Sequence, residues 1–356
     1  MITLTQEQDE VREAARTFLR RYGGRRYFTY HGLAGTGKTV VLAQLARELP
    51  SAVPCTFTGK AASVLRERTG LPVITVHSFL YNYGGTYEDE NGKHQPVFTS
   101  KGENHARTTV LLDECSTIGT RLAEDILATG ARVIACGDPG QLPPVADRQF
   151  FIDANVELTT VHRQALESAV IRQAHAVRSA GRYRNDGPDF RVTERASEDD
   201  LATCGIALCW KNRTRRLLNG ACRRARGIEN DTGLLAGEPV MCLRNDHARR
   251  IYNGAIYPLA VDWVPGDELL VRDGDREVNV FTPTIEGFSP DFETERNDDG
   301  CVPFALAYAA TVHKSQGSEW QKVLFVDEQD PRNPEWPQFA YTAITRASQQ
   351  VAVVRR

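Results

Sequence analysis

Residues 32–39, GLAGTGKT, have the composition and spacing of a loop that binds nucleotide phosphates. Glycines let successive backbone N–H groups close around a phosphate, and a following helix adds the partial positive charge of its N-terminus. Lys38 can reach the β- and γ-phosphates, and the Thr39 hydroxyl can bind Mg²⁺. The pattern therefore predicts a site for ATP and Mg²⁺. The remaining contacts to the nucleotide are expected from Gly32, Gly35, Thr36 and Gly37.

Two adjacent carboxylates, Asp113 and Glu114, end the apolar run 110–112. An acidic pair at the end of a strand is often only a helix cap or a solvated turn. This pair follows a phosphate loop in what is predicted to be the same sheet. We therefore expect Asp113 to hold Mg²⁺ and Glu114 to orient and deprotonate the attacking water.

Three further residues lie in contexts that suit ATP hydrolysis. Gln141 lies in the run GDPGQLPP after another expected strand, where it can sense the γ-phosphate; a proline-stiffened loop is the alternative. Arg163 lies in LTTVHRQ and Arg346 in YTAITRA, both in a second α/β half. An arginine from a second domain can stabilise transferring phosphoryl charge and make cleft closure depend on nucleotide. The expected catalytic residues are therefore Lys38, Glu114, Gln141, Arg163 and Arg346.

Strands and helices alternate around these residues, which predicts parallel sheets with helices on both faces. A first helix is expected after Thr5, where TQEQ has the form of a capping box. Helices are also expected at 38–48 and 61–68. The expected strands are 27–30, 52–57, 110–112 and 132–135 in the first half, and 206–210, 323–326 and 351–354 in the second.

Two segments interrupt this alternation. Residues 81–106 are polar and rich in turn formers, and Asn91-Gly92 predicts a hairpin. Residues 243–301 contain short β-like runs at 256–264, 269–272 and 278–281, which predict a small all-β insertion.

Composition limits the class of protein. The chain has 356 residues, 41% of them hydrophobic and 25% charged, as in globular proteins of two or three domains. It has no apolar run long enough for a membrane-spanning helix and no secretory leader pattern. Its eight cysteines form no C-x-x-C pair, which argues against structural zinc and a disulfide framework. We expect reduced thiols and a cytoplasmic setting.

The net charge of −3 gives no sign of a nucleic-acid partner. Residues 211–226, however, carry a run of Lys and Arg without an acidic residue. This run is either a solvated helix face or a patch that follows nucleic-acid phosphates, and charge alone does not decide between them.

Taken in order, these segments resemble the helicase motifs of superfamily 1, and specifically group B, the RecD/Dda-like DNA helicases. The resemblance covers nearly the whole chain. Motif I corresponds to the phosphate loop, motif II to Asp113-Glu114, and motif III to residues 137–144. Residues 158–164 resemble motif IV, 341–347 motif VI, 58–62 motif Ia and 4–8 the Q motif. Residues 311–319, TVHKSQGSE, resemble motif V and are strongly diagnostic for the group.

The resemblance implies an α/β fold with two RecA-like P-loop motor domains. Motor domain 1A is expected at 1–80 and 107–157, with the hairpin or pin insertion 1B at 81–106. Motor domain 2A is expected at 158–242 and 302–356, with an SH3-like β insertion, 2B, at 243–301. No accessory domain is expected before the Q motif, as in compact phage-type or stand-alone forms.

The resemblance also implies ligand contacts. Gln8 would read the adenine edge, although the capping box is an alternative role for the same residue. Glu319 would link motif V to the nucleotide cleft. Phe79 could stack on a base or pack in the core. The expected contacts to the single strand are Thr58, Lys60 and His77 in the first motor domain and Thr311, His313 and Lys314 in the second.

The function expected from this resemblance is an ATP-dependent DNA helicase that translocates 5′→3′ on single-stranded DNA. Alternatives are a translocase with weak unwinding, an RNA-directed helicase of the same group, and a binding module with a decayed ATPase. Expected partners are single-stranded DNA, duplex junctions and a single-stranded-DNA-binding or replication protein, with no membrane. We expect a functional monomer serving DNA replication, repair or recombination in a bacterial or phage-infected cell.

Overall fold

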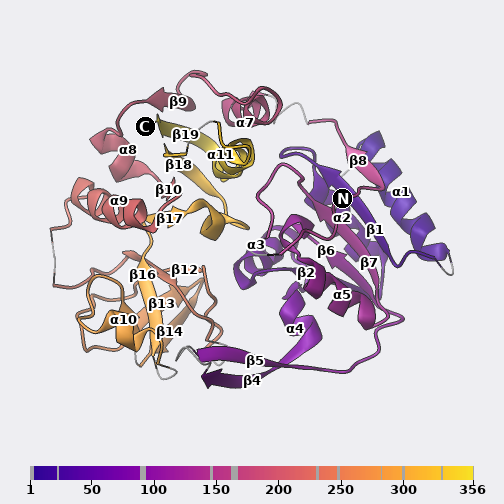
Figure 1. Ribbon diagram of the computed structural model, residues 1–356, viewed down its shortest axis with the longest axis horizontal. Coiled ribbons are helices and arrows are strands. Elements are labelled where there is room, and N and C mark those ends of the chain that lie inside the picture. The colour runs from indigo at the N-terminus through magenta and orange to yellow at the C-terminus, as the bar shows by residue number, and fades with distance from the viewer. Residues whose placement is uncertain are drawn as a thin grey trace.

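The computed structural model describes residues 4–21, 24–88, 94–144, 147–161, 167–229, 232–246, 249–281, 283–298, 301–329 and 332–355. Figure 1 shows two α/β lobes side by side, with a small β insertion below the lobe that carries the C-terminus and a hairpin below the junction between the lobes. No helix among these residues is long and apolar enough to cross a membrane.

The first lobe is built on a six-stranded parallel sheet with strand order β3-β2-β6-β7-β1-β8. Its strands are β1 (Tyr27–Gly32), β2 (Ala52–Thr56), β3 (Ile74–Thr75), β6 (Thr109–Leu112), β7 (Arg132–Gly137) and β8 (Val156–Leu158). Its helices are α1 (Gln6–Arg20), α2 (Lys38–Glu48), α3 (Gly59–Thr69), α4 (Val76–Leu80) and α5 (Thr120–Ala128), with a short 3₁₀ turn at Cys115–Thr117.

Helices cover both faces of this sheet, so its central strands are apolar on both sides. On one face Leu111 packs with Leu42 of α2 and Val11 of α1. On the other face Val110 packs with Ile126 of α5. The predicted helix 38–48 is confirmed, whereas α3 begins two residues before its predicted start because Thr58 caps it.

The second lobe is built on a five-stranded parallel sheet with strand order β17-β10-β18-β19-β9. Its strands are β9 (Phe190–Thr193), β10 (Ile206–Cys209), β17 (Ala309–Thr311), β18 (Trp320–Asp327) and β19 (Ala347–Arg355). Its helices are α7 (Ala169–Ala180), α8 (Glu198–Thr203), α9 (Asn212–Ala225) and α11 (Trp336–Ile344), with a 3₁₀ turn at Val312–Ser315. The predicted α/β class with two parallel sheets is confirmed.

Two elements stand apart from the parallel sheets: an antiparallel hairpin and a β insertion whose four-stranded sheet mixes antiparallel and parallel pairs. The hairpin pairs β4 (Tyr81–Glu88) with β5 (His94–Ser100); the predicted turn at Asn91-Gly92 lies outside the described residues. The β insertion has a four-stranded sheet of β12 (Ile256–Pro258), β11 (Pro239–Cys242), β16 (Val302–Leu306) and β15 (Pro283–Ile285). It also contains β13 (Leu269–Asp273), β14 (Arg276–Val280) and α10 (Phe292–Glu295).

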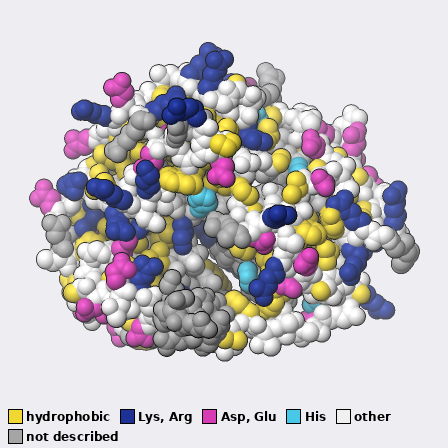
Figure 2. Space-filling model, in the orientation of Figure 1, with side chains coloured by type: hydrophobic (Ala, Val, Ile, Leu, Met, Phe, Trp, Pro, Cys, Tyr) yellow, Lys and Arg dark blue, Asp and Glu magenta, His cyan; other side chains and the backbone are white. Residues whose placement is uncertain are grey.

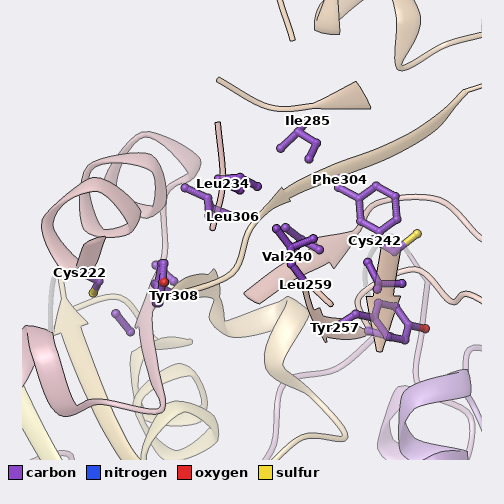
Figure 3. Packing of buried hydrophobic residues seen from close by; sticks show 14 of the residues in the cluster. Cys222, Leu234, Val240, Cys242, Tyr257, Leu259, Ile285, Phe304, Leu306 and Tyr308 are labelled. Atoms are coloured by element: carbon purple, nitrogen blue, oxygen red, sulfur yellow. The ribbon is translucent and has the colours of Figure 1, made fainter. Parts of the chain in front are cut away.

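The β insertion shares a hydrophobic core with the second lobe. Figure 3 shows Cys222 of α9 in the same cluster as Val240 of β11 and Phe304 of β16. Strands β11 and β16 lie just outside residues 243–301, the predicted bounds of the insertion, so the insertion sheet extends beyond those bounds. The shared core joins the insertion to the second lobe.

The basic run at residues 211–226 forms α9, and the structure assigns much of it to internal contacts. Arg215 and Arg216 pair with Glu286 of the insertion, and Arg226 donates to backbone carbonyls of Leu201 and Cys204. Arg215 and Arg226 are therefore held by internal contacts, whereas the Arg216 side chain stays largely exposed beside Glu286.

Arg223 of α9 forms a buried ion pair that anchors the insertion. Its guanidinium donates to both carboxylate oxygens of Glu238, at 2.6 and 2.8 Å, and to the Gly233 carbonyl at 3.0 Å. Arg223 is 5% exposed and Glu238 is 2% exposed. Because water does not reach these side chains, each charge is compensated by the opposite charge of its partner.

We predict that Arg223→Ala destabilises the second lobe by about 3–5 kcal/mol, because it leaves the Glu238 carboxylate buried and unpaired. Chemical denaturation followed by circular dichroism measures this loss. Arg213→Ala, on the exposed face of the same helix, is the matched control and should change stability by less than about 0.5 kcal/mol. Equal stability of the two variants would contradict the anchoring role.

Candidate nucleotide and nucleic-acid sites

The phosphate loop connects the end of β1 to the first turn of α2. Gly35 and Gly37 have φ angles of 85° and 83°, which favour glycine. Gly32 is needed for a different reason: a Cβ at this position would lie 2.4 Å from Thr36 Oγ1. Three positions of the loop between β1 and α2 therefore require glycine.

Lys38 and Thr39 lie at the start of α2 beside two carboxylates of the first lobe. Lys38 Nζ donates to the Leu33 carbonyl at 3.1 Å and lies 3.9 Å from Asp138 Oδ2. The Thr39 hydroxyl donates to Asp113 Oδ2 at 3.3 Å. A hydroxyl and a carboxylate oxygen are ligands that suit Mg²⁺.

Glu114 follows Asp113 in the left-handed conformation, with φ 53°, at the end of β6. Burial raises the pKa of Glu114, and the positive charge of Arg346 opposes that rise. A Cβ on Gly317 would lie 3.3 Å from Glu114 Oε2, so Glu114 is close to the second lobe. Glu114 lines both the nucleotide cleft and the larger cleft described below.

The second lobe contributes to the nucleotide cleft an arginine that is held by backbone carbonyls. Arg346 is 5% exposed, and its guanidinium donates to the carbonyls of Thr342 and Ser318 at 3.1 and 3.3 Å. It lines the same cleft as Lys38 and Thr39. The cleft therefore lies between the lobes.

Gln141 and Glu319 also line this cleft. Gln141 is 9% exposed, and no described group lies within hydrogen-bonding distance of its buried Oε1. Glu319 forms an ion pair with Arg68 of α3 across the cleft, at 2.8 Å. Arg163 lies outside the described residues.

Gln8 makes the predicted capping box and a second contact. Its side chain accepts from the Thr5 backbone N–H, and its own N–H donates to the Thr5 hydroxyl. Its side-chain amide also donates to the Thr36 carbonyl at 3.3 Å. Gln8 can therefore cap α1 and lie beside the phosphate loop at the same time.

A larger cleft of about 1290 Å³ runs between the lobes, the hairpin and the β insertion. Figure 2 shows the surface hollowed at the junction of the lobes, with histidine side chains beside the hollow. The predicted strand contacts that line it are Thr58, Lys60, His77, His313 and Lys314. Thr311 is not among its described lining residues; it ends β17 and pairs with Cys209.

Aromatic rings form part of the wall of this cleft. The His77 ring lies 5.8 Å from Phe57, 5.9 Å from Tyr81 and 5.5 Å from Phe98 of the hairpin, between ring centroids. Phe57, Tyr81 and Phe98 are not among the residues predicted to contact the strand, although Tyr81 and Phe98 lie in the predicted hairpin. Phe79 is 6% exposed and packs in the core of the first lobe, which was one of its two predicted roles.

The basic groups of the cleft are partly desolvated. Lys60 Nζ lies 4.7 Å above the Trp320 ring, and burial lowers the pKa of Lys60 to about 8. Burial also lowers the pKa of Lys314, whose Nζ donates to Asn253 of the insertion at 2.7 Å. The Thr58 hydroxyl caps α3 by accepting from Ala61.

Comparisons with known proteins show the family and the fold of the chain. Residues 3–188 match the model of an AAA domain, and residues 306–354 match that of a UvrD-like helicase C-terminal domain. The chain is also similar in fold to the solved structure of Bacteroides Pif1 bound to ssDNA. The TM-score is 0.62 at 18% identity, over 99% of this chain and 92% of the other. The two lobes are therefore RecA-like domains.

Two curated relatives extend the likeness to sequence. The ATP-dependent RecD2 DNA helicase of Deinococcus radiodurans is 30% identical over 97% of this chain and 48% of its own length. The ATP-dependent DNA helicase Pif1 of Bdellovibrio bacteriovorus is 30% identical over 81% of this chain and 75% of its own length. The chain thus spans about half of the RecD2 relative. It belongs to the RecD/Pif1-like helicases, in group B of superfamily 1.

Proposed function

We propose that the chain is an ATP-dependent DNA helicase that translocates 5′→3′ along single-stranded DNA. One observation carries the proposal: both clefts lie between the same two lobes, and Glu114 lines both of them. A movement of the lobes that follows the state of the nucleotide therefore also changes the cleft for the strand. The direction of translocation rests on the likeness to group B helicases.

At the nucleotide, Lys38 and the backbone of the phosphate loop bind the phosphates. Thr39 and Asp113 would hold Mg²⁺, which would neutralise phosphate charge there. Glu114 is the general base for water, and Gln141, whose Oε1 has no partner among the described residues, senses the γ-phosphate. Arg346 stabilises transferring charge from the second lobe, with Arg163 as its proposed counterpart. Gln8 reads the adenine, and Glu319 couples motif V to the cleft.

In the larger cleft, each lobe grips the strand with its own residues. Thr58, Lys60 and His77 belong to the first lobe, and His313 and Lys314 to the second. Hydroxyl, ammonium and imidazole groups suit phosphate oxygens, and the aromatic wall suits bases. Alternate tightening of the two grips as the lobes close and open would advance the protein along the strand. Thr311, at the end of β17 and outside the lining of this cleft, is proposed as a further strand contact of the second lobe on the likeness of residues 311–319 to motif V.

The alternative is a single-stranded DNA translocase that unwinds weakly. The observation that favours it is the small size of the insertion at 81–106, whose described strands form one two-stranded hairpin. The other alternative is an RNA-directed helicase of the same group. A protein distinguishes RNA from DNA through polar contacts to the 2′-hydroxyl.

ATP turnover with no nucleic acid, with single-stranded DNA and with single-stranded RNA of the same sequence tests the proposal. We expect stimulation by DNA and weaker stimulation by RNA. Turnover that neither strand stimulates would contradict a motor that couples the two clefts.

The pKa of Lys60 gives a pH prediction. Because that pKa is about 8, Lys60 loses its proton and its charge as the pH rises through 8. Affinity for single-stranded DNA should therefore fall between about pH 7 and pH 9 by up to about tenfold, the equivalent of one lost phosphate contact. Fluorescence anisotropy with labelled oligonucleotide measures it. Lys60→Arg stays charged over this range, so its affinity for single-stranded DNA should depend much less on pH. If the affinity of Lys60→Arg fell with pH as steeply as that of the wild type, the role of Lys60 would be contradicted.

A further inference from the structure

Tyr341 of α11 joins the second lobe to two parts of the first lobe through a single oxygen. Its hydroxyl donates to Asp138 Oδ2 at 2.6 Å and accepts from the Ala34 N–H of the phosphate loop at 2.8 Å. The side chain is fully buried. Burial and the nearby Asp138 carboxylate raise the pKa of Tyr341 well above its usual value, so the hydroxyl keeps the proton that it donates.

The ring of Tyr341 lies against Gly140, which has no side chain. A Cβ on Gly140 would lie 2.9 Å from Tyr341 Cε1, so a side chain at residue 140 would displace the ring. The neighbouring Thr342 hydroxyl accepts from the Leu142 N–H at 3.0 Å. Motif VI therefore docks onto motif III at two consecutive residues.

Asp138 lies between Tyr341 and the nucleotide lysine. It is 2% exposed; its Oδ1 accepts from the Gly140 N–H at 2.8 Å, and its Oδ2 accepts from Tyr341. Lys38 Nζ is 3.9 Å from the same Oδ2, farther than a direct hydrogen bond. The Asp138 carboxylate is thus hydrogen-bonded to two neutral donors, and it lies close enough to Lys38 that a small movement would bring the two charges into contact.

We propose that Tyr341 is a positioning residue that converts opening of the cleft into loss of nucleotide affinity. While the lobes are closed, its hydroxyl holds Asp138 and leaves Lys38 available to phosphate. When the lobes separate, Tyr341 withdraws with the second lobe, and Asp138 pairs with Lys38 instead. The carboxylate then competes with the phosphates of ADP for the same ammonium group, and ADP leaves. This inference rests on the proposed ATP site.

The proposal predicts opposite effects for two conservative variants. Tyr341→Phe keeps the ring and loses the hydroxyl, so Asp138 is free to pair with Lys38 even when the lobes are closed. Loss of a hydrogen bond to a charged group corresponds to about a tenfold effect or more, so release of mant-ADP should become about tenfold faster. Asp138→Asn removes the competing charge and should slow release by about threefold or more. The double variant should release mant-ADP as slowly as Asp138→Asn alone.

Stopped-flow release of mant-ADP, chased with unlabelled Mg-ATP, measures all four proteins, with melting temperatures as a record of folding. A purely structural role for Tyr341 predicts that Asp138→Asn also loosens the site and that the double variant is the worst of the four. Faster release from Asp138→Asn, or fastest release from the double variant, would overturn the proposal. Release of mant-ADP from Tyr341→Phe at the wild-type rate would also overturn it. If Tyr341→Phe does not fold, slower release from Asp138→Asn still supports the proposal and faster release overturns it. Wild-type protein that fails to bind mant-ADP would instead overturn the ATP site itself.

Discussion

Lys38→Ala is expected to abolish ATP turnover, a loss of at least about a thousandfold, while binding of single-stranded DNA remains largely intact. The lysine lies at the first residue of α2, and its ammonium is the positive side-chain charge of the phosphate loop. It lines the nucleotide cleft and is not among the residues that line the larger cleft. The two activities should therefore separate in this variant.

Steady-state turnover with saturating single-stranded DNA and anisotropy with labelled oligonucleotide measure the two activities. Lys322→Ala, which changes an exposed lysine on β18, is the matched control and should retain both. Turnover in Lys38→Ala at the wild-type rate would show that the phosphate loop is not the site of hydrolysis. Parallel loss of DNA binding would indicate that the variant is misfolded, which its melting temperature records.

Arg346→Ala is expected to lower kcat by about a thousandfold and to change ATP affinity far less, because its charge matters mainly in the transition state. The guanidinium comes from the second lobe, and its charge acts on Glu114 in the first. Its hydrogen bonds to the Thr342 and Ser318 carbonyls fix the direction of its side chain. Little reorganisation is then needed at the moment of reaction.

Single-turnover hydrolysis and equilibrium binding of a fluorescent ATP analogue separate the two effects. Arg346→Lys keeps a charge but loses the planar fork, and should recover only part of the rate. Arg272→Ala, at an exposed side chain of β13 in the β insertion, should leave both quantities unchanged. A large loss of affinity with unchanged kcat would assign Arg346 to ground-state binding. The same measurements on Arg163→Ala test its proposed role as a counterpart.

Local chemistry made the nucleotide site predictable. The phosphate loop needs glycine at positive φ, and a lysine and a threonine at fixed offsets, so sequence and geometry are tied together within residues 32–39. The strand that carries Asp113 and Glu114 was equally clear, because a sheet covered on both faces requires a continuous apolar strand. These requirements act over a few neighbouring residues and leave a readable pattern.

Contacts between distant segments could not be predicted in the same way. The basic run of α9 gave no sign that Arg223 pairs with Glu238 or that Arg215 pairs with Glu286, because those partners depend on how the insertion packs. The Tyr341 hydroxyl lies on Asp138 although more than half of the chain separates them. Thr311 matched a family motif, yet its position at the end of β17 leaves it outside the lining of the larger cleft.

Strand displacement on two matched DNA duplexes, one with a 5′ tail and one with a 3′ tail, tests the central claim most directly. Mg-ATP drives the reaction, and Lys38→Ala is the control. We predict that only the duplex with the 5′ tail is opened. Opening only from the 3′ tail would contradict the proposed direction. Failure to open either duplex, while single-stranded DNA still stimulates ATP turnover, would contradict a helicase and leave a translocase.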